Sequence, residues 1–376
     1  MQSLSESLVK VEDLVLRFYT YAGVVEALDR VNLEIKPGEI LGLVGETGCG
    51  KSVTSLSILK IVPAPGVIED GKIIINIDGK KIDILKQNED FLRKVRGNDI
   101  SMVFQEPRAY LNPVYTVEQQ IGEVLIEHRK KEFIDRALEE LKRRNKGFYV
   151  RLYTKMSKNP NALSIRILSK IPLIRRFENP LKKEIRKEVI NILKSLEIAD
   201  PERVAGMFPH ELSGGMAQRV VIAMALACNP KLLICDEPTT NLDVTVQAQI
   251  LELIRILRQN FKSSILYITH DLGVVAELCE RVAVMYAGNV VELAEIMEIF
   301  KKPLHPYTRA LLESIPRPKE KFKSIPGIVP SLINPPKGCR FHDRCYYAMD
   351  ICKKNKPHFI EVTKNHFVAC HLYGEK

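Results

Sequence analysis

The stretch GETGCGKS, residues 45–52, lies between an apolar run, EILGLV (39–44), and a helical pattern from Lys51 to about Ile61. In a loop of this spacing, the glycines let consecutive backbone N–H groups turn toward a phosphate, and the following helix adds its N-terminal dipole. Lys51 supplies positive charge for the β- and γ-phosphates, and the Ser52 hydroxyl is placed to bind Mg²⁺. A purely structural glycine turn would need neither side chain. The stretch therefore predicts a nucleoside triphosphate site.

An acidic pair supplies the second half of this site. The stretch LLICDEP, residues 232–238, reads as a buried strand with Asp236 at its carboxyl end, the edge at which open α/β sheets bind ligands. We expect Asp236 to hold Mg²⁺, through water. Glu237 is the candidate to polarise the water that attacks the phosphate.

The rest of the pattern indicates an α/β fold, since strand-like and helix-like stretches alternate. The short apolar stretches are typical of a covered parallel sheet, and a long helix is predicted from Val244 to Gln259. The predicted strands are VNLEI (31–35), EILGLVG (39–45), GKIIINIDG (71–79), DISMVFQ (99–105), KLLICD (231–236) and SILYIT (264–269).

The 376 residues predict about two units with a well-buried core. Hydrophobic residues make up 45% and charged residues 27% of the chain, as in ordinary globular proteins. No apolar run reaches the roughly 18 to 20 residues that cross a bilayer. The first residues show neither a basic region nor a long apolar stretch, so no secretory signal is expected. These features predict a cytosolic protein with reduced thiols.

One segment carries the basic character of the chain. Residues 129–187 contain 19 Lys/Arg against 6 Asp/Glu, a local net charge of +13 in a chain whose total is +10. The segment reads as amphipathic helices. It is either a solvated helical hairpin or a surface for anionic headgroups, where each Lys/Arg would contribute about 1 kcal/mol. Nucleic acid is a weaker third reading, because stacking aromatics are not interleaved.

Four cysteines gather near the end of the chain, after proline-rich stretches that read as a linker. Cys339, Cys345, Cys352 and Cys370 are spaced C-x5-C-x6-C-x17-C, without the paired CxxC knuckles of structural zinc sites. Four thiolates at this spacing suit a [4Fe–4S] cluster, with Zn²⁺ or four unliganded thiols as the alternatives. A small tail gains folding free energy from such a centre. The other cysteines, Cys49, Cys228, Cys235 and Cys279, are expected to be packing residues.

The stretch PHELSGGMAQR, residues 209–219, resembles the signature of ABC transporter ATPases. Ser213 can cap the helix that begins at Gly214 and Gly215, which leaves backbone N–H groups free for a phosphate. The resemblance implies that this phosphate belongs to ATP held by an opposite subunit in a head-to-tail dimer. It also implies family roles for Gln105 in VFQEP, Asp243 in TTNLD and His270 in LYITHD. The adenine-stacking aromatic would fall at Phe18 or Tyr19.

Five stretches narrow the resemblance to the ATPase subunits of dipeptide/oligopeptide importers, over Val9 to about Leu312 and again in the tail. These are VFQEPRAYLNPVYTVEQQIGE, PHELSGGM, DEPTTNLDVTVQAQIL, VMYAGNVVE and HPYTRALL. Met216, Ala217 and Asn241 depart from the general pattern without removing a catalytic group. By this resemblance Glu237, His270 and Gln105 are catalytic, and Ser52, Gln105 and Asp236 bind Mg²⁺. The implied nucleotide contacts are Gly45, Glu46, Thr47, Gly48, Cys49, Gly50, Lys51, Ser52, Val53, Phe18, Ser213, Gly214, Gly215 and Asp243.

The resemblance implies an ATPase that uses ATP and Mg²⁺ and carries a [4Fe–4S] cluster. Its implied partners are a second ATPase subunit, two membrane permeases and an extracellular solute-binding protein, at the cytoplasmic face of the membrane. Peptides are the family cargo, with oligosaccharide or nickel as alternatives. A soluble ABC ATPase acting on nucleic acid is a competing hypothesis, although such proteins normally carry two ATPase halves. A third hypothesis makes the tail a redox sensor.

The predicted organisation has two parts. Residues 1–315 form an ABC ATPase domain, with a helical subdomain at about 106–228 and the basic insertion at about 129–183. Residues 316–376 form a linker and a Cys-rich, metal-binding tail.

Overall fold

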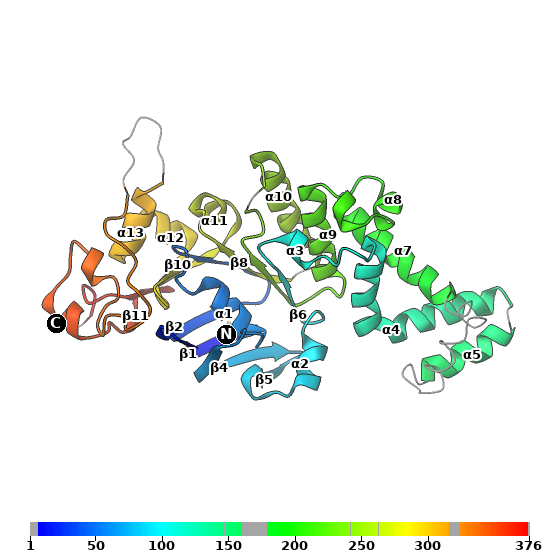
Figure 1. Ribbon diagram of the computed structural model, residues 1–376, viewed down its shortest axis with the longest axis horizontal. Coiled ribbons are helices and arrows are strands. Elements are labelled where there is room, and N and C mark those ends of the chain that lie inside the picture. Colours follow the sequence, from blue (N-terminus) through cyan, green and yellow to red (C-terminus); the bar gives the residue numbers. More distant parts are fainter. Residues whose placement is uncertain are drawn as a thin grey trace. The chain divides into compact units, whose positions relative to one another are not determined.

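The computed structural model describes residues 7–145, 147–158, 179–240, 242–261, 263–315 and 324–374 (Figure 1). Two compact units emerge from it. The first comprises residues 1–96, 231–237 and 254–376, and the second comprises residues 97–230 and 238–253. Asn241 and residues 159–178 of the predicted basic insertion lie outside the described residues. The predicted domain boundaries stay predictions.

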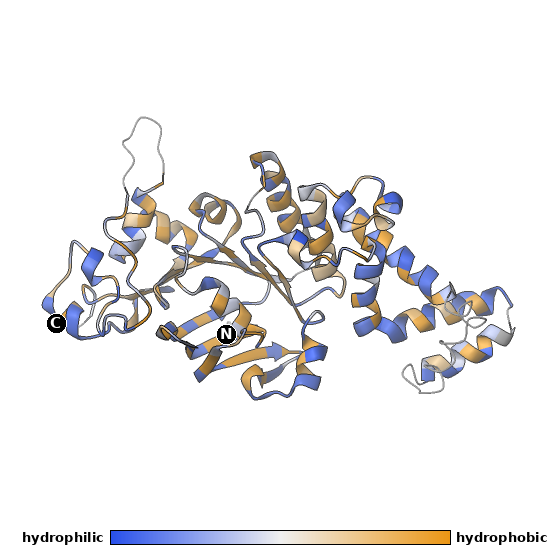
Figure 2. Ribbon diagram, viewed as in Figure 1, coloured by the Kyte–Doolittle hydropathy of each residue, from blue (hydrophilic) through white to orange (hydrophobic). Residues whose placement is uncertain are grey.

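The first unit is built on a mixed sheet whose strands follow the order β11-β12-β10-β9-β3-β8-β7. Strand β3 pairs in parallel with β8 and β9, and β7 pairs in parallel with β8. Figure 2 shows these central strands coloured as hydrophobic, and β3, β7, β8 and β9 are buried along their whole lengths. The strands are β3 (Ile40–Val44), β7 (Leu232–Asp236), β8 (Ser264–Thr269), β9 (Arg281–Tyr286), β10 (Asn289–Glu295), β11 (Phe359–Thr363) and β12 (His366–Ala369).

The register of this sheet brings the ends of its parallel strands together. Val44 at the end of β3 lies opposite Thr269 at the end of β8, and Asp236 at the end of β7 lies opposite Ile268. Three chain segments that are far apart in the sequence therefore leave the sheet at one edge. Residues 45, 237 and 270 follow directly after these strand ends, so the edge is where a ligand site is expected.

A second sheet in the same unit has the order β2-β1-β4-β5 and is antiparallel throughout. Its strands are β1 (Val9–Thr20), β2 (Gly23–Ile35), β4 (Gly66–Ile77) and β5 (Lys80–Asp83). The helical elements of the unit are α1 (Lys51–Ile58), η1 (Ile84–Lys86), α2 (Glu89–Val95), α11 (Leu272–Leu278), α12 (Ile296–Lys301), α13 (Pro306–Glu313), η4 (His342–Arg344) and α14 (Asp350–Lys354).

The cysteine-bearing tail joins this unit through its two strands. Strand β12 pairs antiparallel with β10 at Glu292 and Leu293, and β11 pairs with β12. The His366 ring contacts the buried Glu292 carboxylate at 2.7 Å. An isolated bridge between Val25 and Ile333 adds a contact with β2. The tail is thus packed onto the main sheet by backbone pairing.

The second unit is mainly helical. Its elements are β6 (Ile100–Val103), α3 (Pro107–Tyr110), α4 (Val117–Arg143), α5 (Gly147–Lys158), α7 (Asn179–Ser195), α8 (Pro201–Ala205), η3 (Pro209–Glu211), α9 (Gly214–Leu226) and the first part of α10 (Val244–Phe261). Helix α4 begins at a capping box in which Thr116 and Gln119 satisfy each other's backbone N–H groups. Its buried residues include Phe133, Ile134 and Leu141.

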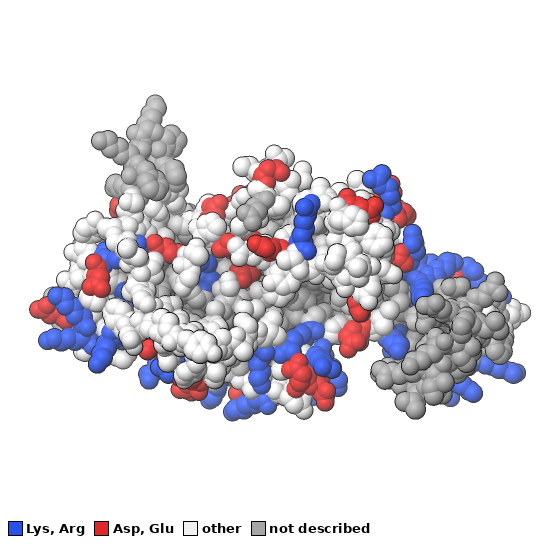
Figure 3. Space-filling model, viewed as in Figure 1, with Lys and Arg blue, Asp and Glu red and all other residues white. Residues whose placement is uncertain are grey.

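Many of the basic side chains of the second unit are paired with acids. Arg129 contacts Glu132 at 2.8 Å and Glu188 at 3.0 Å, so it joins α4 to α7. Arg136 binds Glu188 at 2.9 Å. Figure 3 shows Lys and Arg gathered over this part of the unit, and α4, α5 and α7 each carry exposed basic side chains. The described part of the basic insertion is therefore a helical hairpin with internal ion pairs.

The predicted strands are confirmed, as is the helix from Val244. The helix that begins at Lys51 is shorter than predicted and ends at Ile58, because Lys60 takes a left-handed conformation with φ 52°. None of the helices in the described ranges is both long and apolar enough to cross a membrane.

Candidate nucleotide site

The loop 45–50 connects β3 to α1, as the sequence predicts. Gly45 has φ 155°, and a Cβ placed on it would lie 2.1 Å from the Met285 carbonyl oxygen. Gly50, the residue before α1, has φ 105°. Only glycine fits at these two positions. The loop is consequently held tightly against the end of β9, with Cys49 buried beneath it.

Lys51 is buried at the start of α1. Its ammonium donates to the Gly45 carbonyl at 2.8 Å and to the Glu46 carbonyl at 3.1 Å. The charge therefore lies within the loop rather than in solvent. A phosphate bound in the same loop would therefore lie close to the positive charge of the Lys51 ammonium.

Ser52 and Asp236 come together from α1 and β7. The Ser52 hydroxyl donates to Asp236 Oδ1 at 3.1 Å, across 184 residues of sequence. The pKa of the Asp236 carboxyl is raised above its usual value, mainly because the group is buried. The hydrogen bond from Ser52 acts in the opposite direction, and the neighbouring Glu237 carboxylate adds to the increase. A hydroxyl and a carboxylate in contact are oxygen ligands of the type that Mg²⁺ prefers.

Glu237 and His270 meet at the same edge of the sheet. The His270 Nδ1 atom lies 3.2 Å from Glu237 Oε1. The His270 side chain is 59% exposed, and the Glu237 side chain is 14% exposed. Glu237 has a left-handed φ of 46°, and its backbone N–H donates to the Ile268 carbonyl at 2.9 Å. Strain of this kind, held by a neighbouring strand, is found at functional sites.

The two candidate aromatics lie on β1 with different surroundings. Phe18 is half-buried and packs toward Gly66 of β4, where an added Cβ would lie 2.7 Å from its ring. Tyr19 is largely exposed and its hydroxyl donates to Glu69. The remaining loop residues, Thr47, Gly48 and Val53, are exposed or half-buried around the loop.

The other predicted residues belong to the second unit. Ser213 caps α9, with its hydroxyl accepting from the Met216 N–H at 3.3 Å. Gly215 needs its small size, because a Cβ there would lie 2.9 Å from Val246. Asp243 accepts from the Val246 N–H at 2.9 Å, at the start of α10. Gln105 follows β6 and is exposed.

The structure brings all four tail cysteines to one small cavity, which His305, His342 and His371 also line. All four thiols are free. Burial raises the pKa of Cys339 to about 12 and that of Cys370 to about 11. Among the described residues, no group of three or more His, Cys, Asp or Glu is arranged closely enough to hold a metal ion.

Sequence reasoning missed one residue next to these cysteines. Arg344 forms two hydrogen bonds with the Glu46 carboxylate of the phosphate loop, at 2.7 Å and 3.0 Å. The only signal in the sequence is its position beside Cys345. Glu46 lies nearly 300 residues earlier in the sequence, and nothing near it predicts a contact with Arg344.

Comparisons with known proteins agree with this geometry. Residues 28–240 match the ABC transporter family, and residues 291–352 match the C-terminal region of oligopeptide/dipeptide transporters. The chain is 43% identical to the oligopeptide transport ATP-binding protein OppD of Bacillus subtilis, over 97% of this chain and 88% of that protein. It is 42% identical to a probable peptide ABC transporter ATP-binding protein of Sinorhizobium fredii, over 97% and 95%.

Solved structures of ABC cassettes also match this chain. The dimeric ATP-binding cassette MJ0796, bound to ADP and Pi, has a TM-score of 0.56 and 26% identity, over 77% of this chain and 98% of that one. The CbiO1 protein from Clostridium perfringens, part of the ABC transporter complex CbiONQ, has a TM-score of 0.54 and 27% identity, over 79% and 92%. The chain therefore belongs to the ABC transporter family and is an ATP-hydrolysing subunit within its oligopeptide/dipeptide branch.

Proposed function

We propose that this chain energises the import of di- or oligopeptides by hydrolysing ATP to ADP and phosphate. The observation that carries the proposal is the match, in a single chain, to both the ABC ATPase and the oligopeptide/dipeptide transporter C-terminal region. Relatives that are 39–43% identical over nearly the whole chain are named for peptide transport. Cargo specificity is assigned to the partner proteins.

In this proposal the loop 45–53 binds the triphosphate. Lys51 exchanges its bonds to the Gly45 and Glu46 carbonyls for phosphate oxygens, and the start of α1 adds its dipole. Ser52 and Asp236, whose oxygens lie 3.1 Å apart, would hold Mg²⁺, and Gln105 of the second unit is assigned a role as a further ligand. Phe18 or Tyr19 stacks on the adenine.

Hydrolysis is assigned to Glu237. It orients the attacking water and accepts a proton from it. The water oxygen bonds to the γ-phosphorus, and the bond between the γ-phosphorus and the oxygen that bridges to the β-phosphate breaks. His270, whose ring nitrogen lies 3.2 Å from the carboxylate, holds Glu237 in position. Gln105, in the second unit, is assigned a role in the same step.

A second ATPase subunit completes each site. Ser213 caps α9, and Gly214 and Gly215 leave the helix start uncovered by side chains, which suits a γ-phosphate presented by another chain. Asp243 lies at the start of the neighbouring α10. The related cassette MJ0796 is dimeric with ADP and Pi bound. We assign the partner to a related second ATPase, with two permeases and an extracellular solute-binding protein, at the cytoplasmic face of the membrane.

Reconstitution tests this function. The chain, co-purified with its membrane partners, is placed in proteoliposomes with internal ATP, and uptake of a labelled dipeptide and a labelled pentapeptide is measured. Labelled maltotriose and Ni²⁺ are the alternative cargoes. ATP-dependent peptide uptake, absent with Lys51→Ala, supports the proposal. Uptake of maltotriose or Ni²⁺ without peptide uptake rejects the peptide assignment.

We propose further that the four tail cysteines hold a [4Fe–4S] cluster, with Zn²⁺ as the alternative. The number and type of donors support this proposal, since four free thiols line one cavity and a four-thiolate cluster uses four. As they stand in the described residues, the thiols are not close enough together to hold a metal ion. The histidines have other partners, since His342 lies 2.8 Å from the Cys339 carbonyl and His371 lies 2.9 Å from the Asn355 carbonyl. A bound cluster supplies cross-links that stabilise a segment with few core residues.

Metal analysis of anaerobically purified protein tests this assignment. Four iron atoms and four acid-labile sulfides per chain, with charge-transfer absorption in the visible range, support the cluster. One zinc atom per chain and no iron supports the alternative. Neither metal in protein that retains its tail would reject both.

The described part of the basic insertion gives no support to a role in nucleic-acid binding. Arg129, Arg136 and Lys183 contact acidic side chains of the same hairpin, so part of its charge is neutralised internally. The remaining exposed charges are assigned to a solvated face of the hairpin.

A further inference from the structure

Glu46 places a carboxylate in an anion-binding loop, where its charge would repel a triphosphate. The structure shows how its charge is compensated. Arg344 donates from Nη1 to Glu46 Oε2 at 2.7 Å and from Nη2 to Oε1 at 3.0 Å. The arginine side chain is 4% exposed and the glutamate side chain 27%. Two parallel bonds of this kind also fix the orientation of the carboxylate.

Arg344 is itself held by contacts from the tail and from Tyr286 of β9. Its Nε donates to the Pro326 carbonyl at 2.8 Å, and Nη1 donates to the Tyr286 hydroxyl at 3.2 Å. The guanidinium lies 5.7 Å from the centre of the Tyr286 ring and 5.9 Å from that of Phe341. Arg344 ends the short helix η4, directly before Cys345. Its position therefore depends on the fold of the cysteine segment.

A second series of hydrogen bonds connects the tail with the phosphate loop, residues 45–50. Arg340 donates to the Ala287 carbonyl at 2.6 Å, and the next residue, Gly288, donates its N–H to the Cys49 carbonyl at 2.8 Å. The Glu46 N–H donates to the Tyr307 hydroxyl at 2.9 Å. The phosphate loop is thus bonded on one side to the turn between β9 and β10, which the tail also holds.

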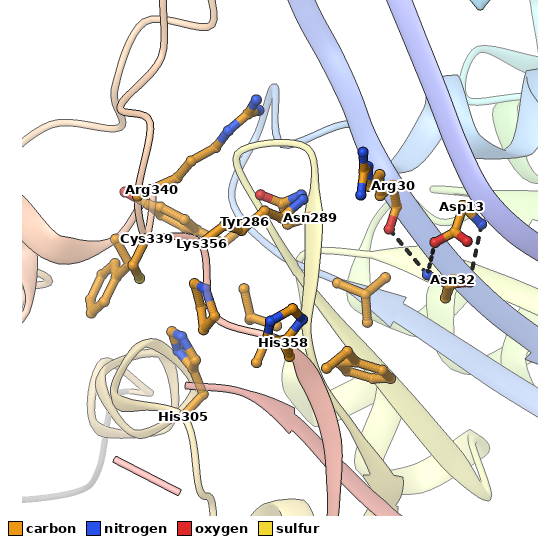
Figure 4. A pocket seen from close by; sticks show the side chains of 17 residues that line it. Asp13, Arg30, Asn32, Tyr286, Asn289, His305, Cys339, Arg340, Lys356 and His358 are labelled. Carbon is orange, nitrogen blue, oxygen red and sulfur yellow. Dashed lines mark hydrogen bonds between the residues drawn. The ribbon is translucent and has the colours of Figure 1, made fainter. Parts of the chain in front are cut away.

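The tail has another attachment, through Lys356, whose partner Asp29 lies on β2. The Lys356 ammonium binds the Asp29 carboxylate and carbonyl, both at 2.8 Å. Lys356 lines a cavity of about 260 Å³ together with Cys339, Arg340 and Tyr286 (Figure 4). It is as much a part of the tail packing as Arg344. It provides a matched control because its partner lies outside the phosphate loop.

We propose that Arg344 is a positioning residue for the nucleotide: it neutralises and orients Glu46, so that the fold of the cysteine segment sets the affinity of the phosphate loop. Without Arg344, a free carboxylate faces the incoming phosphates. Because coupling between two sites is reciprocal, bound nucleotide also stabilises the tail. The inference rests on the proposal that the loop holds the phosphates.

Isothermal titration with MgADP tests the inference on the full chain. Arg344→Met should weaken binding by on the order of tenfold at low salt, and the loss should shrink at high salt because it is electrostatic. Glu46→Gln leaves the Arg344 charge uncompensated and should bind MgADP more tightly than the unsubstituted chain, and the double variant Arg344→Met/Glu46→Gln should regain most of the affinity lost in Arg344→Met. Lys356→Met should bind MgADP like the unsubstituted chain. Thermal unfolding without nucleotide checks that each variant is folded.

Two results would overturn the inference. One is an unchanged MgADP affinity in folded Arg344→Met; the other is a double variant that binds no better than Arg344→Met, which would make the loss structural rather than electrostatic. Lys51→Ala separates this inference from the assignment of the loop. If Lys51→Ala abolishes binding while Arg344→Met does not alter it, only the coupling to the tail fails.

Discussion

The phosphate loop and the cysteine cavity are both small sites in the first unit, but they are assembled in different ways. The loop is a continuous stretch, fixed by buried parallel strands and by glycines that let the backbone approach Met285. The cavity gathers thiols from Cys339 to Cys370, on a segment with two short helical elements, η4 and α14, and two strands at one end of the main sheet.

The electrostatics of the two sites also differ. In the loop, a buried ammonium and the start of α1 favour an anion before any ligand arrives. In the cavity, burial and mutual repulsion raise the pKa of Cys339, Cys345 and Cys370, so the ionised form of these thiols is disfavoured without a cation. One site is thus organised by the fold, whereas our proposal for the other makes its order depend on a bound metal centre.

The largest expected effect is on catalysis at the organised site. Glu237→Gln removes the proton acceptor while keeping the size and polarity of the side chain, so phosphate release should fall by roughly 10²- to 10⁴-fold. MgATP binding should persist, and ATP should hold the variant in a dimer detectable by size-exclusion chromatography. Near-normal hydrolysis would remove Glu237 from its assigned role.

A glycine substitution tests whether the backbone organises the loop. Gly45→Ala places a Cβ 2.1 Å from the Met285 carbonyl oxygen, so the loop must shift and MgADP affinity should fall at least about tenfold. Gly79→Ala is the control, because Gly79 also has a positive φ, of 80°, but its added Cβ would meet nothing within 4 Å. Equal affinities of the two variants would contradict a backbone-built site.

Loss of one thiol tests whether the cavity depends on its ligand. Cys345→Ser should strip most of the bound iron and lower the thermal unfolding midpoint by a few degrees, because the tail loses a cross-link. Iron content is measured anaerobically. Cys228→Ser, which changes a free thiol of the second unit, should leave iron unchanged. Unaltered metal in Cys345→Ser would defeat the ligand assignment.

The smallest effect concerns a thiol within the loop. Burial raises the pKa of Cys49, so the reactive thiolate is scarce at neutral pH. Alkylation by iodoacetamide should be slow at pH 7 and rise about tenfold per pH unit as long as the pH stays below that pKa. Mass spectrometry of the Cys49 peptide measures this rate. Rapid labelling at pH 7 would show that the loop opens.

Several features of the site could be predicted from local sequence. The strand before Gly45, the helix after Lys51 and the acidic end of β7 are each encoded within a few residues, because burial, glycine content and periodicity are local properties. The α/β core follows from the alternation of such stretches. The end of α1 was predicted too late because Lys60 takes a left-handed conformation.

Other features depend on distant partners. The contact between Ser52 and Asp236 spans 184 residues, and that between Glu46 and Arg344 spans 298. Neither distance nor bond pattern can be derived from composition or spacing. The pairing of β12 with β10, which carries the cysteine tail onto the main sheet, is equally non-local.

The sequence by itself determined the chemistry of this protein: a glycine loop with Lys51 and Ser52, a strand that ends in Asp236 and Glu237, and four cysteines in a tail. These follow from residue type and short spacing, which act over a few residues. Only the tertiary structure decided that the tail contacts the phosphate loop through Arg344. Such a contact is set by strand pairing and packing across the whole unit. These interactions join residues far apart in the sequence, so they produce no local or periodic sequence pattern from which the contact could be predicted.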